Sequence, residues 1–192
     1  MSTTTRSILL SALRLNGAAF DRAVITDAQI AEHRVPDGWS LTSSARYRPQ
    51  DAAGGDDALI DGRRGGPDFR LGRWQGYLGT DLEATLDVGR PREVRRIAIG
   101  LLQNAGAWIL MPREVQFALS DGGVAFAEVG TVTNSVPVDA PGTVIREVGV
   151  DVAPQRARYG RVRLRHAGPL PASHDSAGEP SWLFADEIVV EP

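Results

Sequence analysis

The sequence contains no cysteine and no lysine, and its apolar runs are short. Without cysteine there can be no disulfide framework, no thiol nucleophile and no cysteine-ligated zinc site. No window approaches the roughly 20 consecutive apolar residues of a membrane-spanning helix, so we expect no membrane span. All 21 basic residues are arginine, an imbalance that we attribute to genomic base composition.

A convincing signal peptide is also missing from the N-terminus. The apolar run at residues 8–10 is soon interrupted, and no typical cleavage site follows it. We expect residues 1–38 to form an N-terminal extension or linker remnant. Within it, the sequence predicts a short amphipathic helix over residues 8–15 and a capped helical turn over residues 26–32.

The known catalytic motifs are absent as well. The three histidines are far apart, none lies in an H-E-x-x-H pattern, and no G-x-S-x-G motif is present. Two carboxylate pairs, Asp81 with Glu83 and Asp186 with Glu187, have the residue types for acid–base catalysis. Asp81 and Glu83 fall on the same side of a predicted strand and are interpreted as solvated residues, and we expect the protein not to be an enzyme.

A nucleic-acid partner is not favoured. The net charge is −3, which gives no global attraction for phosphates. On a predicted strand over residues 158–165, Arg161, Arg163 and Arg165 stand in one row and have the chemistry to pair with phosphates. The interpretation we prefer is an exposed strand face that pairs with acidic faces of its neighbours.

The residues that the sequence does contain favour strands and turns. It has 21 glycines and 12 prolines with 42% hydrophobic residues, a composition that fits many short strands joined by turns. Alternating apolar positions predict about eight strands. These lie near residues 39–43, 82–88, 93–101, 114–119, 126–129, 143–150, 158–165 and 182–190. We therefore predict an all-β domain over residues 39–192, an eight-stranded jelly-roll β-sandwich.

Residues 57–89 combine turn formers, aromatic residues and a strand. Asp61 and Asp68 flank a glycine-rich turn, which presents carboxylates and backbone carbonyls together, the hard oxygen ligands that Ca²⁺ requires. No 12-residue EF-hand spacing is present, so other roles for these residues stay open.

Aromatic residues in or beside predicted loops suggest a sugar site, because aromatic rings hold the C–H faces of sugars and a few polar groups orient them. The alternative is that these rings simply cover the core of the sandwich. The candidate aromatic residues are Trp74, Tyr77, Trp108 and Trp182, and the nearest polar residues in sequence are Arg70, Gln75, Gln103 and His174.

Six segments in order give the chain a resemblance to a known family. They are ALIDG (58–62), DFRLGRWQGYLGTDLEATLDVG (68–89), LLQNAGAWIL (101–110), LSDGG (119–123), ARYGRVRLRHAG (157–168) and PASHDSAGEPSWLFADEIVVE (171–191). Together they resemble the discoidin, or coagulation factor type C, domain. They are more narrowly similar to the domain at the C-terminus of bacterial family 20 β-N-acetylhexosaminidases.

The resemblance implies a galactose-binding-type jelly roll with a structural Ca²⁺ ion. Carried over to this chain, the ion would contact Asp61, Glu187 and main-chain oxygens near Ala58 and Ala185, with Asp68 less closely matched. The catalytic barrel of the hexosaminidases is absent. The resemblance also implies glycan-binding loops that hold Arg70, Trp74, Gln75, Tyr77, Gln103, Trp108, His174 and Trp182.

These implications give two functional hypotheses. The first is a non-catalytic carbohydrate-binding module for terminal galactose or N-acetylhexosamine groups. The second is a structural accessory domain that packs on a glycoside hydrolase catalytic domain, or on another partner, without binding sugar. Either one implies a secreted or periplasmic protein.

Overall fold

The computed structural model describes residues 8–9, 14–15, 18–19, 24–25 and 35–192. The chain divides into two compact units, Met1–Arg34 and Val35–Pro192.

In the first unit the described residues form short antiparallel pairs. Strand β1 (Ile8–Leu9) pairs with β4 (Val24–Ile25), and β2 (Arg14–Leu15) pairs with β3 (Ala18–Ala19). The helix predicted over residues 8–15 is therefore wrong at these positions. Its prediction relied on apolar spacing, whereas β-branched isoleucine and valine favour paired strands. The helical turn predicted for residues 26–32 lies outside the described residues.

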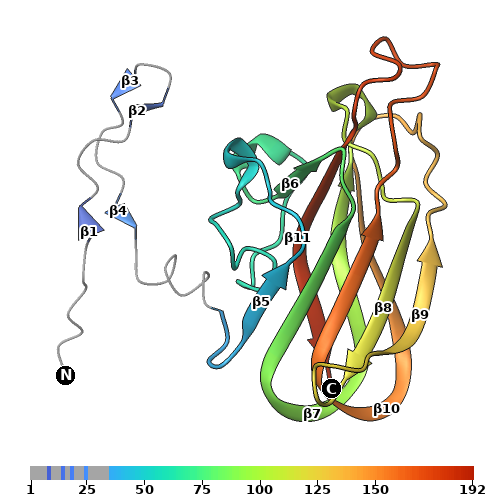
Figure 1. Ribbon diagram of the computed structural model, residues 1–192. Coiled ribbons are helices and arrows are strands. Elements are labelled where there is room, and N and C mark those ends of the chain that lie inside the picture. The colour runs from blue at the N-terminus through green and yellow to red at the C-terminus, as the bar shows by residue number, and fades with distance from the viewer. Residues whose placement is uncertain (1–7, 10–13, 16–17, 20–23, 26–34) are drawn as a thin grey trace. The chain divides into compact units, whose positions relative to one another are not determined.

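The second unit is an antiparallel β-sandwich, which confirms the predicted fold class (Figure 1). Its strands pair in the order β6-β11-β7-β10-β8-β9, and β5 also pairs with β7. The strands are β5 (Ser40–Ser43), β6 (Gln75–Leu78), β7 (Leu82–Gln103), β8 (Glu114–Ser120), β9 (Ala127–Thr133), β10 (Val144–Arg165) and β11 (Trp182–Glu191).

Three short 3-10 helices interrupt the connections of this unit. They are η1 (Pro49–Asp51), η2 (Phe69–Leu71) and η3 (Ala105–Ala107). Within the described residues, no helix has the length and apolar character needed to cross a membrane.

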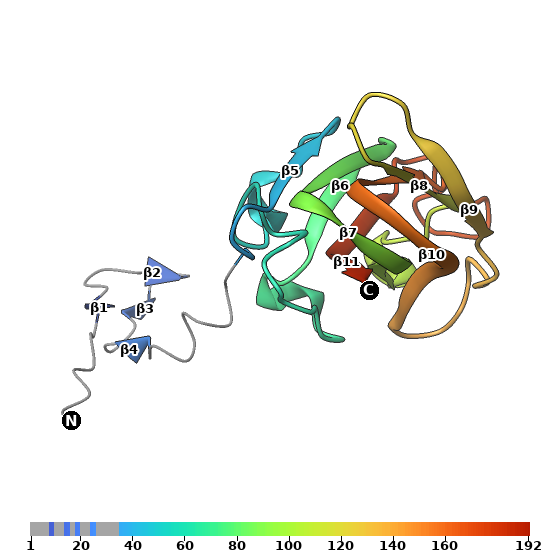
Figure 2. The ribbon, with the colours of Figure 1, turned by 90° about the horizontal axis from the view of Figure 1, so that it is seen from below.

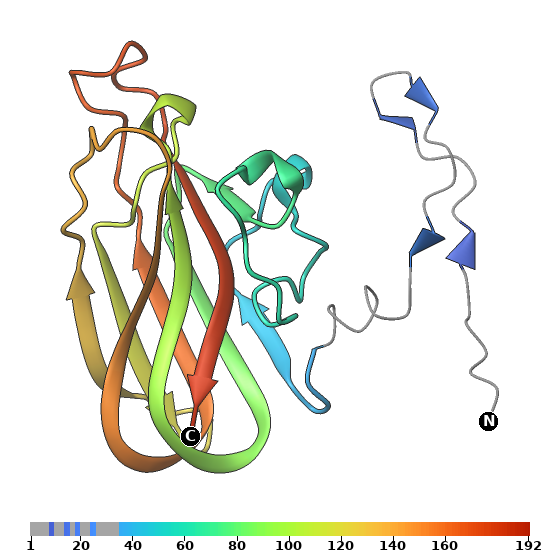
Figure 3. The same ribbon diagram turned by 180° about the vertical axis from the view of Figure 1, so that it is seen from behind.

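Strands β7 and β10 belong to both layers of the sandwich because each bends in its middle (Figure 3). They pair along almost their whole length, with register shifts between Asp151 and Gln155 and between Ala157 and Tyr159. Such irregularities bend a strand without ending it. Two pairs of predicted strands, 82–88 with 93–101 and 143–150 with 158–165, are thus each one continuous strand.

The bend leaves two open flanks where the layers do not pair with one another. In the described residues β5 pairs only with β7, and β6 pairs only with β11. On the other flank β9 pairs only with β8. The end-on view places β5 and β9 on opposite sides of the sandwich (Figure 2).

The alternating residues predicted to face the core do so. Leu82, Ala84 and Leu86 from the first half of β7 are fully buried, as are Ile97 and Ile99 from the second half. Consecutive residues in the second half of β7 are buried, so other chain segments cover both of its faces. A smaller second core forms there from Trp74, Leu102, Ile109 and Phe184.

One strand was not predicted. Residues 75–78, which belong to none of the predicted strands, form β6 and pair with Trp182–Ala185 of β11. Four residues are too few to display a clear alternation, and this strand is buried on both faces near its start. Gly76 has a tertiary reason as well, since a Cβ there would lie 2.6 Å from the Phe184 ring.

Candidate functional site

Two connections meet at one end of the sandwich and carry most of the predicted aromatic residues. The η3 loop and the long loop before β11 are joined by backbone hydrogen bonds, since Trp182 N–H donates to the Trp108 carbonyl at 2.7 Å. The His174 ring adds a bond from Nε2 to the Ala105 carbonyl at 3.0 Å, and its Nδ1 accepts from Ser176 N–H. Figure 1 shows both loops at the same end.

The aromatic rings at this end pack edge to face. Trp108 and His174 have ring centroids 6.5 Å apart, and Trp182 and Phe184 have centroids 5.9 Å apart. Phe69 of η2 continues the series against Phe184, also at 5.9 Å. Trp108 and Trp182 are only half-buried. Their rings therefore combine fixed positions with exposed surface, as a sugar-stacking residue needs.

The backbone of Trp108 is held in an unusual conformation. Its φ of 67° lies in the left-handed region, which a residue with a Cβ rarely adopts. The Trp108 N–H donates to the Ala105 carbonyl, and the Trp108 carbonyl accepts from Trp182 N–H. The surrounding loops thus impose this conformation, a feature that clusters at binding sites.

Arg70 follows Phe69 directly in η2. Its guanidinium Nε donates to Asp68 Oδ1 at 2.8 Å, and the two side chains form an exposed ion pair. The hydrogen bond from Arg70 lowers the pKa of Asp68. Asp68 is also the N-cap of η2, where it accepts from Arg70 N–H. The charges of this pair compensate each other.

Two of the predicted aromatic ligand residues lie in the interior. Trp74 is 1% exposed and Tyr77 is 0% exposed, so neither ring offers a face to a ligand. The Trp74 indole N–H donates to the Gly66 carbonyl at 2.9 Å, and the Tyr77 hydroxyl donates to Gln75 Oε1. Trp74 and Tyr77 follow the core alternative stated above. Burial raises the pKa of Tyr77.

Gln75 and Gln103 hold loops against the sandwich through hydrogen bonds in which the side-chain amide nitrogen donates and the amide oxygen accepts. Gln75 Nε2 donates to the Gly55 carbonyl at 2.7 Å. Gln103 Nε2 donates to the Pro137 carbonyl at 2.7 Å, and its Oε1 accepts from Met111 N–H. Both side chains are buried. They support loops near the candidate site and have no exposed amide for a sugar.

A second group of predicted residues gathers where the loop after β5 meets β11. Asp61 and Glu187 are each only 8% exposed, although both are acidic. Glu187 Oε2 accepts from Gly62 N–H, and Asp61 Oδ1 accepts from Arg63 N–H. The Leu59 carbonyl accepts from Ile188 N–H at 2.7 Å and fixes the two segments side by side.

Burial, together with the negative charges of Asp61 and Asp186, raises the pKa of Glu187 to about 8. Carboxylates that raise one another's pKa in a buried site favour a cation between them. In the described residues no three carboxylate or imidazole side chains form a set of metal ligands. A Ca²⁺ ion here would need main-chain oxygens beside Asp61 and Glu187.

Asp186 is the residue of this centre that the sequence analysis did not place there. It is 2% exposed, accepts from Gly65 N–H at 2.8 Å, and lies 3.5 Å from the Arg64 guanidinium. Burial raises its pKa. Period-two alternation would put Asp186 and Glu187 on opposite faces, but a register shift between Ala185 and Ile188 brings both inside.

The remaining predicted metal ligands, Ala58, Ala185 and Asp68, differ from Asp61 and Glu187 in the atoms they offer or in their surroundings. Ala58 and Ala185 are buried, so only their main-chain atoms are available as ligands. Ala185 lies in the ladder of β11 opposite Leu101 and Gln75. Asp68 is bound to Arg70 at the end of η2 and is partly exposed.

The arginine row of β10 pairs with acidic neighbours, as we preferred. Arg163 Nε donates to Glu83 at 2.5 Å, and Arg165 Nε donates to Glu114 at 3.2 Å. Arg161 lies 3.4 Å from Glu83 and 3.6 Å above the Phe126 ring centroid. This sheet face is therefore a network of compensated charges.

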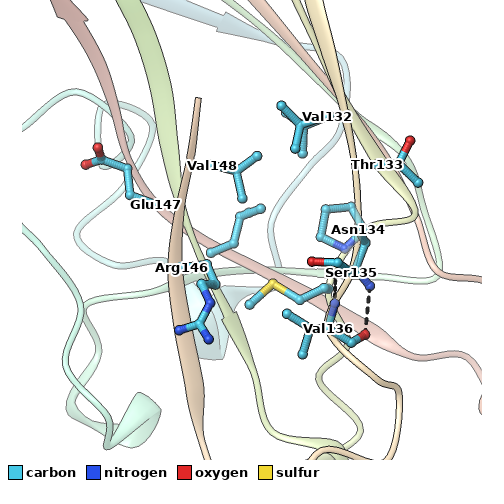
Figure 4. A pocket seen from close by; sticks show the side chains of 12 residues that line it. Val132, Thr133, Asn134, Ser135, Val136, Arg146, Glu147 and Val148 are labelled. Carbon is cyan, nitrogen blue, oxygen red and sulfur yellow. Dashed lines mark hydrogen bonds between the residues drawn. The ribbon is translucent and has the colours of Figure 1, made fainter. Parts of the chain in front are cut away.

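A small hollow lies on the flank between β9 and β10 (Figure 4). Val132, Val136 and Val148 contribute apolar side chains to it, and the Asn134 amide closes a turn with Val136. Its volume of about 110 Å³ is below the roughly 300 Å³ at which small-molecule pockets begin. We assign no ligand to it.

No protein-family model matches the sequence, and no curated protein matches it either. Solved structures do match the fold. A chitosan-binding module of a chitosanase/glucanase from Paenibacillus sp. IK-5 shares 15% identity at a TM-score of 0.51, covering 83% of this chain and 99% of its own. The C-terminal domain of a Bacteroides fragilis chitobiase shares 13% identity at 0.51, covering 83% and 96%.

A third match is the family 32 carbohydrate-binding module of Clostridium perfringens NanJ, solved in complex with galactose. It shares 14% identity at a TM-score of 0.50, covering 82% of this chain and 97% of its own. The discoidin-like, galactose-binding-type fold expected from the sequence is thereby confirmed. At such low identities, the likeness establishes the fold alone.

Proposed function

We propose that this protein is a non-catalytic carbohydrate-binding module whose site is the loop end formed by Trp108, Trp182, His174 and Arg70. The observation that carries the proposal is the pair of half-buried tryptophans held in fixed positions by two bonded loops. The ligand in this proposal is a terminal galactose or N-acetylhexosamine group, as the resemblance to the discoidin domain implies. The carbohydrate-binding modules among the matching structures support the same class of function.

Each residue has a defined part in this proposal. The indole faces of Trp108 and Trp182 stack on the C–H surface of the sugar ring. Arg70 donates hydrogen bonds from the nitrogen atoms that its bond to Asp68 leaves available. His174 positions Trp108 through its edge contact and its bond to Ala105.

The proposal includes a structural Ca²⁺ ion bound by Asp61, Glu187 and neighbouring main-chain oxygens. The raised pKa of Glu187 and the burial of both carboxylates support it, since a cation would offset both unfavourable effects. The ion would supply charge compensation and tie the β5–β6 connection to β11. It would have no part in contact with sugar.

The test is a titration of the labelled protein with galactose, N-acetylglucosamine and N-acetylgalactosamine, each to millimolar concentration, followed by NMR. We expect shifts confined to the loops that hold Trp108 and Trp182, and their loss in Trp182→Ala. The matched control is Phe126→Ala, which removes an aromatic ring from the sheet face and should leave the shifts intact. Unshifted spectra with all three sugars would overturn the proposal.

A second candidate, an accessory domain that packs on a partner protein, has one specific observation in its favour. Leu71 is 70% exposed beside Arg70 at the end of η2. A large exposed apolar residue next to half-buried aromatics is typical of a protein interface. If the sugars leave the spectra unchanged, binding of a glycoside hydrolase catalytic domain to this end becomes the function to measure.

A further inference from the structure

A wide cleft lies on the open flank of the sandwich between the edge strands β5 and β6. Its volume is about 840 Å³, within the range of small-molecule sites. It differs in place and composition from the loop end, because Trp108, His174 and Trp182 do not line it. Two residues that the resemblance implied for sugar binding, Gln75 and Tyr77, line the cleft, but both are buried, and the proposed function assigns no ligand to it.

The segment that crosses the flank is fixed at both ends. Ser44 N–H donates to the Glu83 carbonyl of β7 at 2.9 Å, and Arg48 N–H donates to the Gly76 carbonyl of β6 at 2.9 Å. The segment between these bonds therefore spans the two layers in an extended, anchored form. Arg46, Tyr47 and Arg48 of this segment are among the residues that line the cleft.

Arg46 and Arg48 are the cations of the cleft, and both are exposed. Some arginines in residues 35–192 lie against carboxylates, as Arg96 does against Glu147 and Arg158 against Asp87, and others do not. Within that part of the chain no carboxylate forms an ion pair with Arg46 or Arg48. Two arginines on one anchored segment, without acidic partners, form a ready site for an anionic group.

One carboxylate, Asp56, also lines the cleft, but a neighbour engages it. The Tyr47 hydroxyl donates to Asp56 Oδ1 at 2.8 Å, and this hydrogen bond raises the pKa of Tyr47. The bond holds the loop after η1 against the crossing segment. The cleft keeps a positive excess, since two guanidinium groups face a single carboxylate.

The other polar groups of the cleft are mostly hydroxyls. Thr42 and Ser43 from β5 and Thr80 after β6 contribute them, and Leu41 and Leu78 add apolar surface. Hydroxyls and apolar patches around a charged anchor match a sugar ring that carries an acid group. We infer that this cleft binds an acidic oligosaccharide, with Arg46 and Arg48 pairing with the carboxylates of its uronic acid units. The inference does not depend on the loop-end site.

The experiment compares two ligands of the same length on the full 192-residue chain by calorimetric titration. One is the tetrasaccharide of galacturonic acid, and the other is its fully methyl-esterified, uncharged form. We expect only the charged form to bind. Arg46→Gln and Arg48→Gln should each weaken binding about tenfold, because a hydrogen bond to a charged group is the interaction removed.

The controls separate this site from general electrostatics and from the loop end. Arg90→Gln removes the same charge from the bend of β7 and should leave the affinity unchanged, as should Trp182→Ala. Equal binding of the two tetrasaccharides, or equal weakening by Arg90→Gln, would overturn the inference. So would hexaglutamate binding as tightly as the charged tetrasaccharide, because the cleft would then select acidic peptides. Unchanged melting temperatures of the variants confirm that each is folded.

Discussion

The loop end and the flank cleft of this sandwich use the same residue types in opposite ways. At the loop end the aromatic rings are half-exposed and the arginine is paired, because Arg70 is bound to Asp68. In the flank cleft the ring of Tyr77 is buried, whereas Arg46 and Arg48 are exposed without acidic partners. One scaffold therefore offers an aromatic surface at the loop end and a cationic, hydroxyl-lined surface on the flank.

The difference follows from how each surface is built. Loops project side chains beyond the ends of the strands, so Trp108 and Trp182 can keep part of each ring exposed. A flank is the gap between two sheet edges, and aromatic residues there turn inward to fill the core. The charged side chains of the segment that crosses the flank, Arg46 and Arg48, stay exposed on the surface.

The largest effect should come from the aromatic residue that belongs to neither surface. Trp74→Ala removes a fully buried side chain of the smaller core, and we expect a loss of about 3–5 kcal/mol in the free energy of unfolding. Urea denaturation measures it, with Phe126→Ala as the control. A loss below about 1 kcal/mol would return Trp74 to the list of ligand residues and blur the contrast between the two surfaces.

The next effect tests the acidic centre, which ties the flank loop to β11. Burial raises the pKa of Glu187 from 4.5 to about 8, so without a cation the native state binds more protons than the unfolded state between these values. Stability should then fall as pH rises from 4.5 to 8, by roughly 1–3 kcal/mol. With millimolar Ca²⁺ the fall should shrink, because a cation bound only to the native state stabilises it.

Thermal unfolding across this pH range, in chelator and in Ca²⁺, measures the effect. Glu187→Gln removes the titration and should flatten the curve in chelator, while it loses the stabilisation by Ca²⁺. Curves that coincide with and without Ca²⁺ for the wild-type protein would remove the ion from the proposal.

A smaller effect separates the two surfaces directly. Trp108→Ala removes one stacking face, and we expect neutral-sugar affinity to fall about tenfold, or ~1.4 kcal/mol. Affinity for the charged tetrasaccharide should stay the same, because the flank cleft does not include Trp108. NMR titration for the sugars and calorimetry for the tetrasaccharide measure the two affinities. Parallel losses would mean that the two surfaces form one site.

The smallest effect sharpens the charge of the flank cleft. Asp56→Asn removes its only carboxylate, and the asparagine side-chain oxygen can still accept from the Tyr47 hydroxyl. We expect affinity for the charged tetrasaccharide to rise about two- to fivefold, near 0.5–1 kcal/mol. Calorimetry at two salt concentrations checks this, and the gain should shrink at the higher one. A decrease in affinity would show that Asp56 itself contacts the ligand.

The sequence predicted the strand pattern well where alternation was long. Leu82, Ala84 and Leu86 lie in the core as expected, and the aromatic pair Trp108 and Trp182 meets at one end. Asp61 and Glu187, 126 positions apart in numbering, come into one centre. The sequence did not separate exposed aromatic residues from buried ones, so Trp74 and Tyr77 were placed beside Trp108 as ligand candidates.

The reason is that periodicity is local, while burial and charge pairing depend on which segments pack together. Alternation along each strand determined the all-β class and most core positions, because it needs only neighbours in sequence. Tertiary packing alone decided that β6 is a strand, that a register shift turns Asp186 inward, and that Arg46 and Arg48 face a cleft without acidic partners. Each of these outcomes depends on a second chain segment whose position no local pattern encodes.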